Sequence, residues 1–379
     1  MRFLRPLPIA WNMLIDKPSR LALSVMAVAF SVVIMFMELG FFNGSNDSAA
    51  NLPPHFDCDL ILSHKEKNHL KTGEEFPIDW IYKARDVAGV AASVPLYSGA
   101  DYWWNPQDGS RNRVFTLGVN LDDPMFTTAI IAANRRALQK PGAVIYDRLS
   151  RHELGQVESG TTTTLGRIKV TVVGLCELGP NFSYEGHVIM SADTFLLMQN
   201  QPRDVIDLGL IRVQPGADVN EVRQRLLAAL PPQALLLTPA EINTREIRVT
   251  TQRSPAGIVF GIGLVVGFAI GVIICYQILF NEVNDHLPQF ATLKAMGHPP
   301  RFISGIVLHE AVLMALAGFI PGLIAGFGLY MLIEHFTQIR MFLTPGRVLL
   351  IFVLTSGMCL LAGHLALKKV HSTDPADLF

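Results

Sequence analysis

The sequence predicts an α-helical membrane protein with four transmembrane helices and a large α/β extracytoplasmic domain between helices 1 and 2. Half of the residues are hydrophobic and only 17% are charged, which is apolar for a soluble enzyme. The apolar residues gather in a few long runs, and a segment of mixed helix and strand patterns separates the first run from the others. The formal net charge of −1 offers no basic surface for nucleic acid, so no nucleic-acid partner is expected.

Each apolar run is long enough to cross a hydrocarbon core of about 30 Å at roughly 1.5 Å per residue. The runs are Leu21–Phe42, which contains Glu38 near its end, and the uncharged stretches Gly257–Phe280, Ala311–Ile333 and Val348–Leu367. With its flanks, the third predicted helix covers 303–336. The first run lacks a small-residue cleavage site after it, so we interpret it as a retained helix and not as a signal peptide.

The short flanks of these runs predict the orientation, because cytoplasmic flanks are enriched in Lys and Arg. The basic flanking residues are Arg2, Arg5, Lys17 and Arg20 before the first run, and Lys368 and Lys369 after the fourth. Both termini, 1–20 and 368–379, are therefore expected in the cytoplasm together with the segment 281–302. The segment 43–255 and the short loop 337–347 are then outside, although Arg340 and Arg347 in that loop oppose the bias.

The external segment 43–255 has a repeated β-α-β pattern. The first copy is Asp59–Ser63, Ile78–Val87 and Val90–Pro95, and the second is Leu208–Val213, Val219–Leu230 and Ala234–Leu237. Gly89 and Pro231 stand where the two helices should stop. The pattern predicts one lobe from about 43–100 and 205–250, whose halves are separated by an insertion at about 101–204.

The insertion is richer in strand patterns. Thr161–Gly166 and Arg167–Leu175 predict a hairpin, and His187–Ser191 predicts a further strand. Trp103 and Trp104 belong to an aromatic cluster that has two interpretations, either packing in a core or forming a surface for a partner.

The cysteines show no disulfide framework. Cys58 and Cys176 both lie in the external segment, where a disulfide is chemically feasible, but no spacing pattern supports one. Cys275 and Cys359 lie in predicted membrane helices and are expected to be packing residues.

No catalytic or nucleotide-binding motif occurs in the sequence. It lacks the Gly-x₄-Gly-Lys-Ser/Thr phosphate loop, His-Glu-x-x-His, Cys-x-x-Cys and Gly-x-Ser-x-Gly. We therefore expect no enzyme activity and no cofactor bound by this chain. His364 in the fourth run is expected to be neutral and hydrogen-bonded, and Glu310 to snorkel or to pair with Lys294 or Arg301.

Two predicted helices carry glycines spaced by four. The two trios are Gly263, Gly267 and Gly271 in the second run, and Gly318, Gly322 and Gly326 in the third. This spacing places each trio on one helix face, where backbones can approach closely. The trios predict tight helix contacts, either within the chain or between two copies, and Pro321 should kink the third helix inside its own stripe.

The polar segment Asp285–Phe302 separates the second run from the third. Asn284–Met296 can form a short helix with Asn284 as N-cap and Gly297 as its stop. Its apolar side consists of Leu287, Phe290, Ala291 and Leu293. The helix could lie on lipid headgroups or dock a cytoplasmic partner.

Three stretches of the sequence resemble a known family. Glu282–Ile303 (EVNDHLPQFATLKAMGHPPRFI) resembles the cytoplasmic coupling segment of DevC-type ABC exporter permeases, within the MacB/FtsX-like superfamily. Pro6–Ala49 is similar to the family's opening and first span, with Pro8–Trp11 as a variation on Pro-Leu-Ala-Trp, and Asp374–Phe379 is similar to its tail. The external segment resembles the family's porter-like lobe with a β-rich insertion much more loosely.

The resemblance implies a homodimeric permease subunit in the inner membrane of a Gram-negative-type bacterium, whose separate ABC ATPase subunit uses the ATP. It further implies a periplasmic membrane-fusion adaptor and, through it, a TolC-like outer-membrane channel. ATPase motion would be passed to the external domain (mechanotransmission) to export a lipid-like or other amphiphilic substrate. The residues implied in ATPase coupling are Asp285, His286, Leu287, Phe290, Ala291, Leu293, Lys294, Met296 and Gly297. If the aromatic cluster is a surface for a partner, Trp103 and Trp104 are the residues expected to contact the adaptor.

The alternative from another class is an FtsX-like signalling protein that uses ATPase motion to activate a periplasmic cell-wall hydrolase. Both functions share four spans and a coupling segment, and the two-lobed external segment favours the exporter.

Overall fold

The computed structural model describes residues 7–49, 51–67, 69–70, 74–253, 255–338 and 341–372. The predicted tail Asp374–Phe379 and the flanking Arg2 and Arg5 lie outside these residues. The chain forms two compact units. The helical unit comprises Met1–Asn43, Ile258–Phe336 and Arg340–Phe379, and the α/β unit comprises Gly44–Gly257 with Thr337–Ile339.

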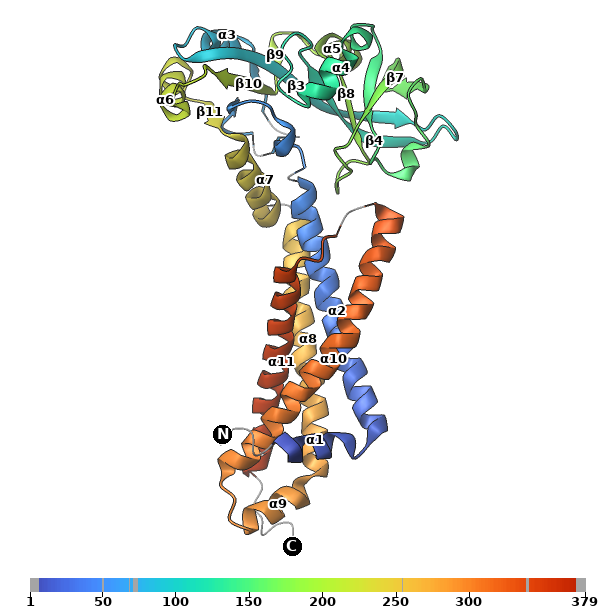
Figure 1. The fold of residues 1–379 in the computed structure, drawn as a ribbon, viewed down its shortest axis with the longest axis vertical. Helices are drawn as coiled ribbons and strands as arrows, with labels where there is room; N and C mark the ends of the chain where they lie inside the picture. The colour runs from blue at the N-terminus through green and yellow to red at the C-terminus, as the bar shows by residue number, and fades with distance from the viewer. Residues whose placement is uncertain are drawn as a thin grey trace. The chain divides into compact units, whose positions relative to one another are not determined.

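The helical unit contains four helices that are long and apolar enough to cross a membrane (Figure 1). They are α2 (Pro18–Ala49), α8 (Pro255–Asp285), α10 (Pro300–Thr337) and α11 (Pro345–Ser372). Large apolar side chains on them remain exposed, for example Val265 on α8 and Ile324 on α10, at 67% each. Such a surface is stable only in an apolar solvent. The predicted four-helix membrane protein is confirmed.

Two short helices complete the helical unit, α1 (Leu7–Ile15) and α9 (Leu287–Ala295). Ala10, Met13 and Leu14 of α1 and Phe290 of α9 belong to the same buried cluster as the long helices. The sequence pattern does not predict α1, because nine residues are too few for an apolar period to stand out. Packing against the bundle therefore stabilises α1.

The first half of the α/β unit confirms the repeated β-α-β pattern. Its strands are β1 (Leu60–His64), β3 (Val90–Trp104), β10 (Leu208–Val213) and β11 (Ala234–Leu237), with helices α3 (Asp79–Arg85), α6 (Val219–Ala229) and α7 (Pro239–Arg253). The strand order β11-β1-β10-β3, antiparallel between neighbours, is that of a split β-α-β sheet. The smaller elements are β2 (Phe76–Pro77), β9 (Val205–Ile206) and the 3₁₀ turn Pro53–His55.

The second half continues the same sheet in the order β4-β8-β5-β7-β6. Its elements are β4 (Arg111–Val119), α4 (Thr128–Leu138), β5 (Ala143–Asp147), the 3₁₀ turn His152–Leu154, β6 (Thr162–Leu165), β7 (Ile168–Cys176), β8 (His187–Ser191) and α5 (Ala192–Gln199). The predicted hairpin is confirmed as β6 and β7, which pair antiparallel around Gly166. The predicted strand His187–Ser191 is confirmed as β8.

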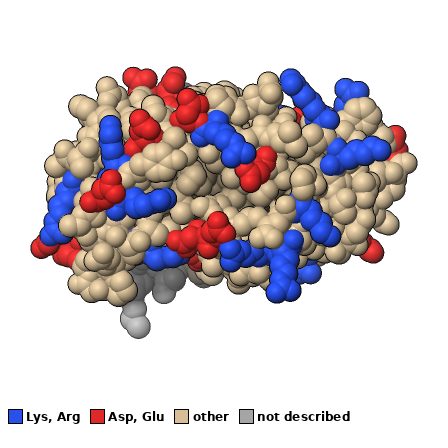
Figure 2. Space-filling model, turned by 90° about the horizontal axis from the view of Figure 1, so that it is seen from above, with Lys and Arg blue, Asp and Glu red and all other residues tan. Residues whose placement is uncertain are grey.

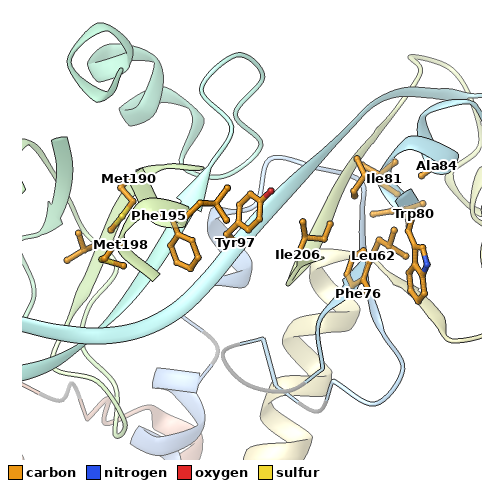
Figure 3. Packing of buried hydrophobic residues seen from close by; sticks show 14 of the residues in the cluster. Leu62, Phe76, Trp80, Ile81, Ala84, Tyr97, Met190, Phe195, Met198 and Ile206 are labelled. Atoms are coloured by element: carbon orange, nitrogen blue, oxygen red, sulfur yellow. The ribbon is translucent and has the colours of Figure 1, made fainter. Parts of the chain in front are cut away.

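Strand β3 joins the two halves. The predicted strand Val90–Pro95 continues to Trp104, because its first part pairs with β10 and its second part, from Tyr97, pairs with β4. In Figure 3, Leu62, Phe76 and Ile81 lie toward the right of the view, and Tyr97 and Phe195 lie further to the left. All five side chains belong to one buried cluster. The two halves therefore share one sheet and one core.

The four cysteines are free thiols. No disulfide joins Cys58 and Cys176, and burial raises the pKa of the Cys58 thiol to about 12 and also raises the pKa of the Cys176 thiol. Cys275 of α8 and Cys359 of α11 are buried with their Sγ atoms 3.6 Å apart. Their predicted packing role is confirmed, and their proximity is new.

Candidate functional site

The predicted coupling segment is a separate helix at one end of the helical unit, where α9 connects α8 to α10 (Figure 1). The helix begins later than predicted, since α8 continues through Asn284 to Asp285 and His286 precedes the first turn of α9. Pro288 stands in that first turn, where its missing N–H leaves no intrahelical bond unmade. Asn284 is therefore a residue of α8 and not an N-cap.

The end of α9 agrees with the prediction. Gly297 has a φ of +85°, a left-handed conformation that favours glycine. The N–H of Gly297 donates to the Lys294 carbonyl at 3.0 Å and that of His298 to the Leu293 carbonyl at 3.1 Å. These two bonds satisfy carbonyls of the last turn in a Schellman arrangement.

The predicted apolar side of α9 faces the chain's own core. Phe290 and Ala291 are 2% and 6% exposed, and Leu293 packs partly against the same cluster. The prediction that Phe290 and Ala291 contact the ATPase is therefore corrected, because these side chains already pack against the helical unit. Leu287 is half-buried.

The exposed residues of this segment include Pro288, Gln289, Thr292 and Lys294 of α9 and Met296 directly after it. We call these residues the outer face of α9. Met296 is 65% exposed, which makes it the apolar centre of this face. Of the predicted coupling residues, Lys294 and Met296 are thus available to another protein.

Asp285, immediately before α9, is held by the start of α2. Its carboxylate forms ion pairs with Arg20 and with Lys17, whose Nζ lies 3.5 Å away. An exposed ion pair contributes at most about 1 kcal/mol. The contact brings the end of α8 beside the start of α2.

Buried polar groups lie behind α9. The ring of His286 contacts Gln289 Oε1 through Nδ1 at 2.9 Å and Glu282 Oε1 through Nε2 at 3.5 Å. Glu310 is 1% exposed, and in the described part of the chain neither carboxylate oxygen has a hydrogen-bond partner. Glu310 therefore neither snorkels nor pairs with Lys294 or Arg301, contrary to prediction.

The α10 trio faces α2, and the α8 trio faces α2 at Gly263 and Gly267 and mainly α11 at Gly271. A Cβ atom on Gly318, Gly322 or Gly326 of α10 would lie closest to Val28, Val32 and Phe36, respectively. On α8, the nearest side chains are Glu38 for Gly263, Ile34 for Gly267, and Met358 followed by Ser31 for Gly271. The close contacts lie within the chain, so these faces are not available to a second copy. Pro321 lies inside the continuous helix α10, and its kink stays a prediction.

The tandem tryptophans of β3 divide between core and surface. Trp103 is fully buried, donates from Nε1 to the Leu154 carbonyl at 3.0 Å and packs against Tyr146. The predicted adaptor contact is therefore wrong for Trp103, because successive strand residues point to opposite faces. Trp104 is partly exposed, with the Arg111 guanidinium 4.2 Å from its ring centroid.

Comparison with known proteins gives two family matches. Residues 21–229 match the MacB-like periplasmic core domain, and residues 258–375 match the FtsX-like permease C-terminal domain. No curated protein matches the chain.

Two solved structures are similar to parts of the chain. The periplasmic region of MacB from Actinobacillus actinomycetemcomitans is 8% identical with a TM-score of 0.36, covering 51% of this chain and 93% of that one. The extracellular domain of the noncanonic ABC-type transporter YknZ from Gram-positive bacteria is 11% identical with a TM-score of 0.32, covering 48% and 99%. Because the MacB-like match spans more than half of the 379 residues and the FtsX-like match covers the C-terminal helices, the chain belongs to the MacB/FtsX-like ABC permease superfamily.

Proposed function

We propose that this chain is the permease subunit of a MacB-like, DevC-type ABC exporter that converts the motion of a separate ATPase into movement of its α/β unit. The observation that carries the proposal is the two-sided character of α9. One side is anchored in the bundle through Phe290 and Ala291, and the outer face is free for a partner. A short helix anchored in this way transmits displacement instead of absorbing it.

The path of transmission runs through α2 and α8. Asp285 and the Arg20 and Lys17 side chains connect the end of α8 to the start of α2, next to α9. Gly318, Gly322 and Gly326 of α10 and Gly263 and Gly267 of α8 pack closely against α2, which restricts sliding of these helices past one another. The chain continues from α2 and from α8 directly into the α/β unit, which would receive the displacement.

The assembly in this proposal has a cytoplasmic ATPase that binds and hydrolyses ATP, with α9 and both termini on the cytoplasmic side of the inner membrane. The α/β unit acts in the periplasm with a membrane-fusion adaptor and, through it, a TolC-like outer-membrane channel. The exported substrate is lipid-like or otherwise amphiphilic.

Two permease copies complete the assembly. The glycine faces cannot supply the dimer interface, since α2 and, at Gly271, mainly α11 occupy them. Exposed apolar side chains of α8, such as Ile262 and Val265, offer an alternative surface for the second copy.

The outer face of α9 provides the test. The full chain, co-purified with its ATPase and reconstituted in lipid vesicles, is compared with Met296→Asp and Lys294→Glu. Each variant should lower permease-stimulated ATP hydrolysis about tenfold, because one anchoring side chain contributes roughly 1.5 kcal/mol or more at such a contact. Lys140→Glu, an exposed reversal in the α/β unit, serves as the matched control.

A cysteine at position 296 should also form a crosslink with the ATPase. Unchanged ATP hydrolysis in both variants, together with labelling of position 296 by lipid-phase probes alone, would mean that α9 lies on the membrane surface and couples nothing.

A further inference from the structure

A pocket of about 330 Å³ lies where the β3–β4 hairpin meets the turn between β6 and β7. Its polar lining consists of Asp101, Tyr102, Trp104, Arg111, Arg167 and Gln199. In Figure 2, Lys and Arg side chains gather over the end of the α/β unit that contains β4 and β7. Among the residues that line the pocket, Arg111 and Arg167 are the basic ones.

Backbone pairing fixes the walls of this pocket. Trp104 of β3 stands opposite Arg111 of β4 in the antiparallel register. The N–H of Gly166, in the β6–β7 turn, donates to the Tyr102 carbonyl at 2.9 Å, and the Thr163 hydroxyl donates to the Trp104 carbonyl. Trp104 and Arg111 thus stand on paired strands, and the turn that carries Arg167 is hydrogen-bonded to β3.

Gly166 brings the turn unusually close to β3. Its φ is +57°, and a Cβ atom there would lie 2.2 Å from Asp101 Oδ2. The other oxygen of Asp101 accepts from the Tyr102 N–H at 2.8 Å. A side chain at position 166 would displace Asp101, so the glycine keeps Arg167 near the pocket.

The two arginines of the pocket have no acidic partner. Arg111 stacks on Trp104, and neither Arg111 nor Arg167 forms an ion pair within the residues that the structure describes. Stacking uses the face of a guanidinium and leaves the N–H groups at its edge free to bind a carboxylate. With Asp101 included, the lining carries a net charge of +1 from two arginines and one aspartate.

Two other arginines of the same half of the sheet do have acidic partners. Arg148 pairs with Glu177 and Arg151 with Glu185. Arg148 and Arg151 thus each form an ion pair with a carboxylate of the chain. No such pair is formed by Arg111 or Arg167 within the described residues.

We propose that this pocket recognises an acidic segment of a partner protein, with an Asp or Glu carboxylate seated between Arg111 and Arg167. The inference rests on the proposed docking of another protein onto the α/β unit and names the chemistry of that contact. Trp, Tyr and Arg are the residues that dominate binding energy at protein interfaces. Tyr102, 54% exposed beside the pocket, supplies a contact for the chain on either side of the seated carboxylate.

A lipid headgroup fits the pocket less well. The only aliphatic side chains in its lining are Ala100 and Met198, so it offers no groove for an acyl chain. The volume accommodates one or two side chains of an extended peptide.

The test measures binding of a fluorescein-labelled hexaglutamate peptide to the full chain in phosphatidylcholine nanodiscs at low salt, by fluorescence anisotropy. Arg111→Glu and Arg167→Glu should each weaken binding about tenfold or more, since each removes a charge-assisted contact and adds repulsion. Arg136→Glu, a charge reversal at an exposed position on α4, should change the affinity for hexaglutamate less than about twofold. This residue does not line the pocket, so its reversal acts only through long-range electrostatics that salt screens. Asp101→Asn should tighten binding about two- to threefold by removing the like charge.

Equal weakening by all three arginine reversals, or equal binding of hexaglutamine, overturns the proposal. Binding of vesicles with anionic lipid through Arg111 and Arg167, in the absence of any hexaglutamate binding, overturns it in favour of a headgroup site. The Arg111→Glu variant should retain full stimulation of the ATPase, so failure of this site is distinguishable from failure of the proposed coupling function.

Discussion

Gly322 of α10 packs directly against Val32 of α2, so closely that a Cβ atom on the glycine would lie 2.7 Å from the valine Cβ. The same relationship repeats one turn before and one turn after, at Gly318 with Val28 and at Gly326 with Phe36. The contact between α2 and α10 therefore depends on the absence of side chains on one stripe of α10.

Replacing Gly322 by Ala should destabilise the single chain by about 1–3 kcal/mol, because the added methyl group overpacks a contact that cannot open locally. Thermal unfolding of the detergent-solubilised protein measures the effect, which should not depend on protein concentration. Gly328→Ala on the same helix is the matched control, since nothing lies within 4 Å of its Cβ position. Equal midpoints for the two variants would show that α10 does not pack on α2 through this stripe.

Truncating Phe290 should reduce stability and not only coupling. The ring is 2% exposed in the core of the helical unit, and deleting a buried Phe side chain costs about 3–5 kcal/mol. Phe290→Ala is therefore expected to lower the thermal midpoint of the permease in the absence of any ATPase. Met296→Ala, on the outer face of the same helix, should leave the midpoint unchanged. A Phe290→Ala protein with an unchanged thermal midpoint would show that Phe290 does not pack in the core and is available to a partner.

Cys275 and Cys359 should form a disulfide on oxidation. Their Sγ atoms are 3.6 Å apart, so a shift of about 1.5 Å reaches the S–S bond length of roughly 2.05 Å. Oxidation by copper–phenanthroline should form this disulfide and so join α8 to α11. For each disulfide the reagent accepts two electrons, and the two thiols release two protons. Peptide mass spectrometry detects the crosslink. Cys58 and Cys176, which are not paired in the structure, should remain separate. Recovery of Cys275 and Cys359 only as separately alkylated thiols would contradict the contact.

Removing Lys67 should make the stability of the α/β unit depend on pH. Lys67 and Asp207 form a buried ion pair, with Nζ 3.4 Å from Oδ1 and side chains 2% and 6% exposed. Burial raises the pKa of Asp207, and Lys67 opposes that rise. Without the lysine, the folded state should hold a proton on Asp207 that the unfolded state, with a pKa near 3.9, releases.

The sign follows from proton binding. Because the folded Lys67→Met protein binds more protons than the unfolded chain above about pH 4, its stability should fall as pH rises from 5 to 8, by up to about 1.4 kcal/mol per pH unit until the raised pKa is passed. Thermal midpoints at pH 5 and pH 8 measure the change against the wild type. Lys140→Met is the exposed control. Parallel pH profiles for wild type and Lys67→Met would show that the lysine does not govern ionisation of Asp207.

Several features were predictable from the sequence because they depend on neighbours along the chain. The membrane helices follow from the length of uncharged runs, and the β6–β7 hairpin and the β-α-β repeats follow from local periodicity. Gly297 was predicted as the end of α9 because a left-handed residue there needs no information beyond the adjacent turn.

The sequence by itself determined that the glycine trios form close contacts and that α9 has an apolar side, but not what those surfaces meet. Only the tertiary structure decided that the α10 trio faces α2, that Phe290 points into the chain's own core, that Trp103 is buried while Trp104 is partly exposed, and that Cys275 lies beside Cys359. A periodic pattern specifies which residues share a face of a helix or strand. The partner of that face comes from segments distant in the sequence. In the α/β unit the partner is selected by burial of apolar surface, and between the membrane helices it is selected by close packing, because lipid is as apolar as the side chains.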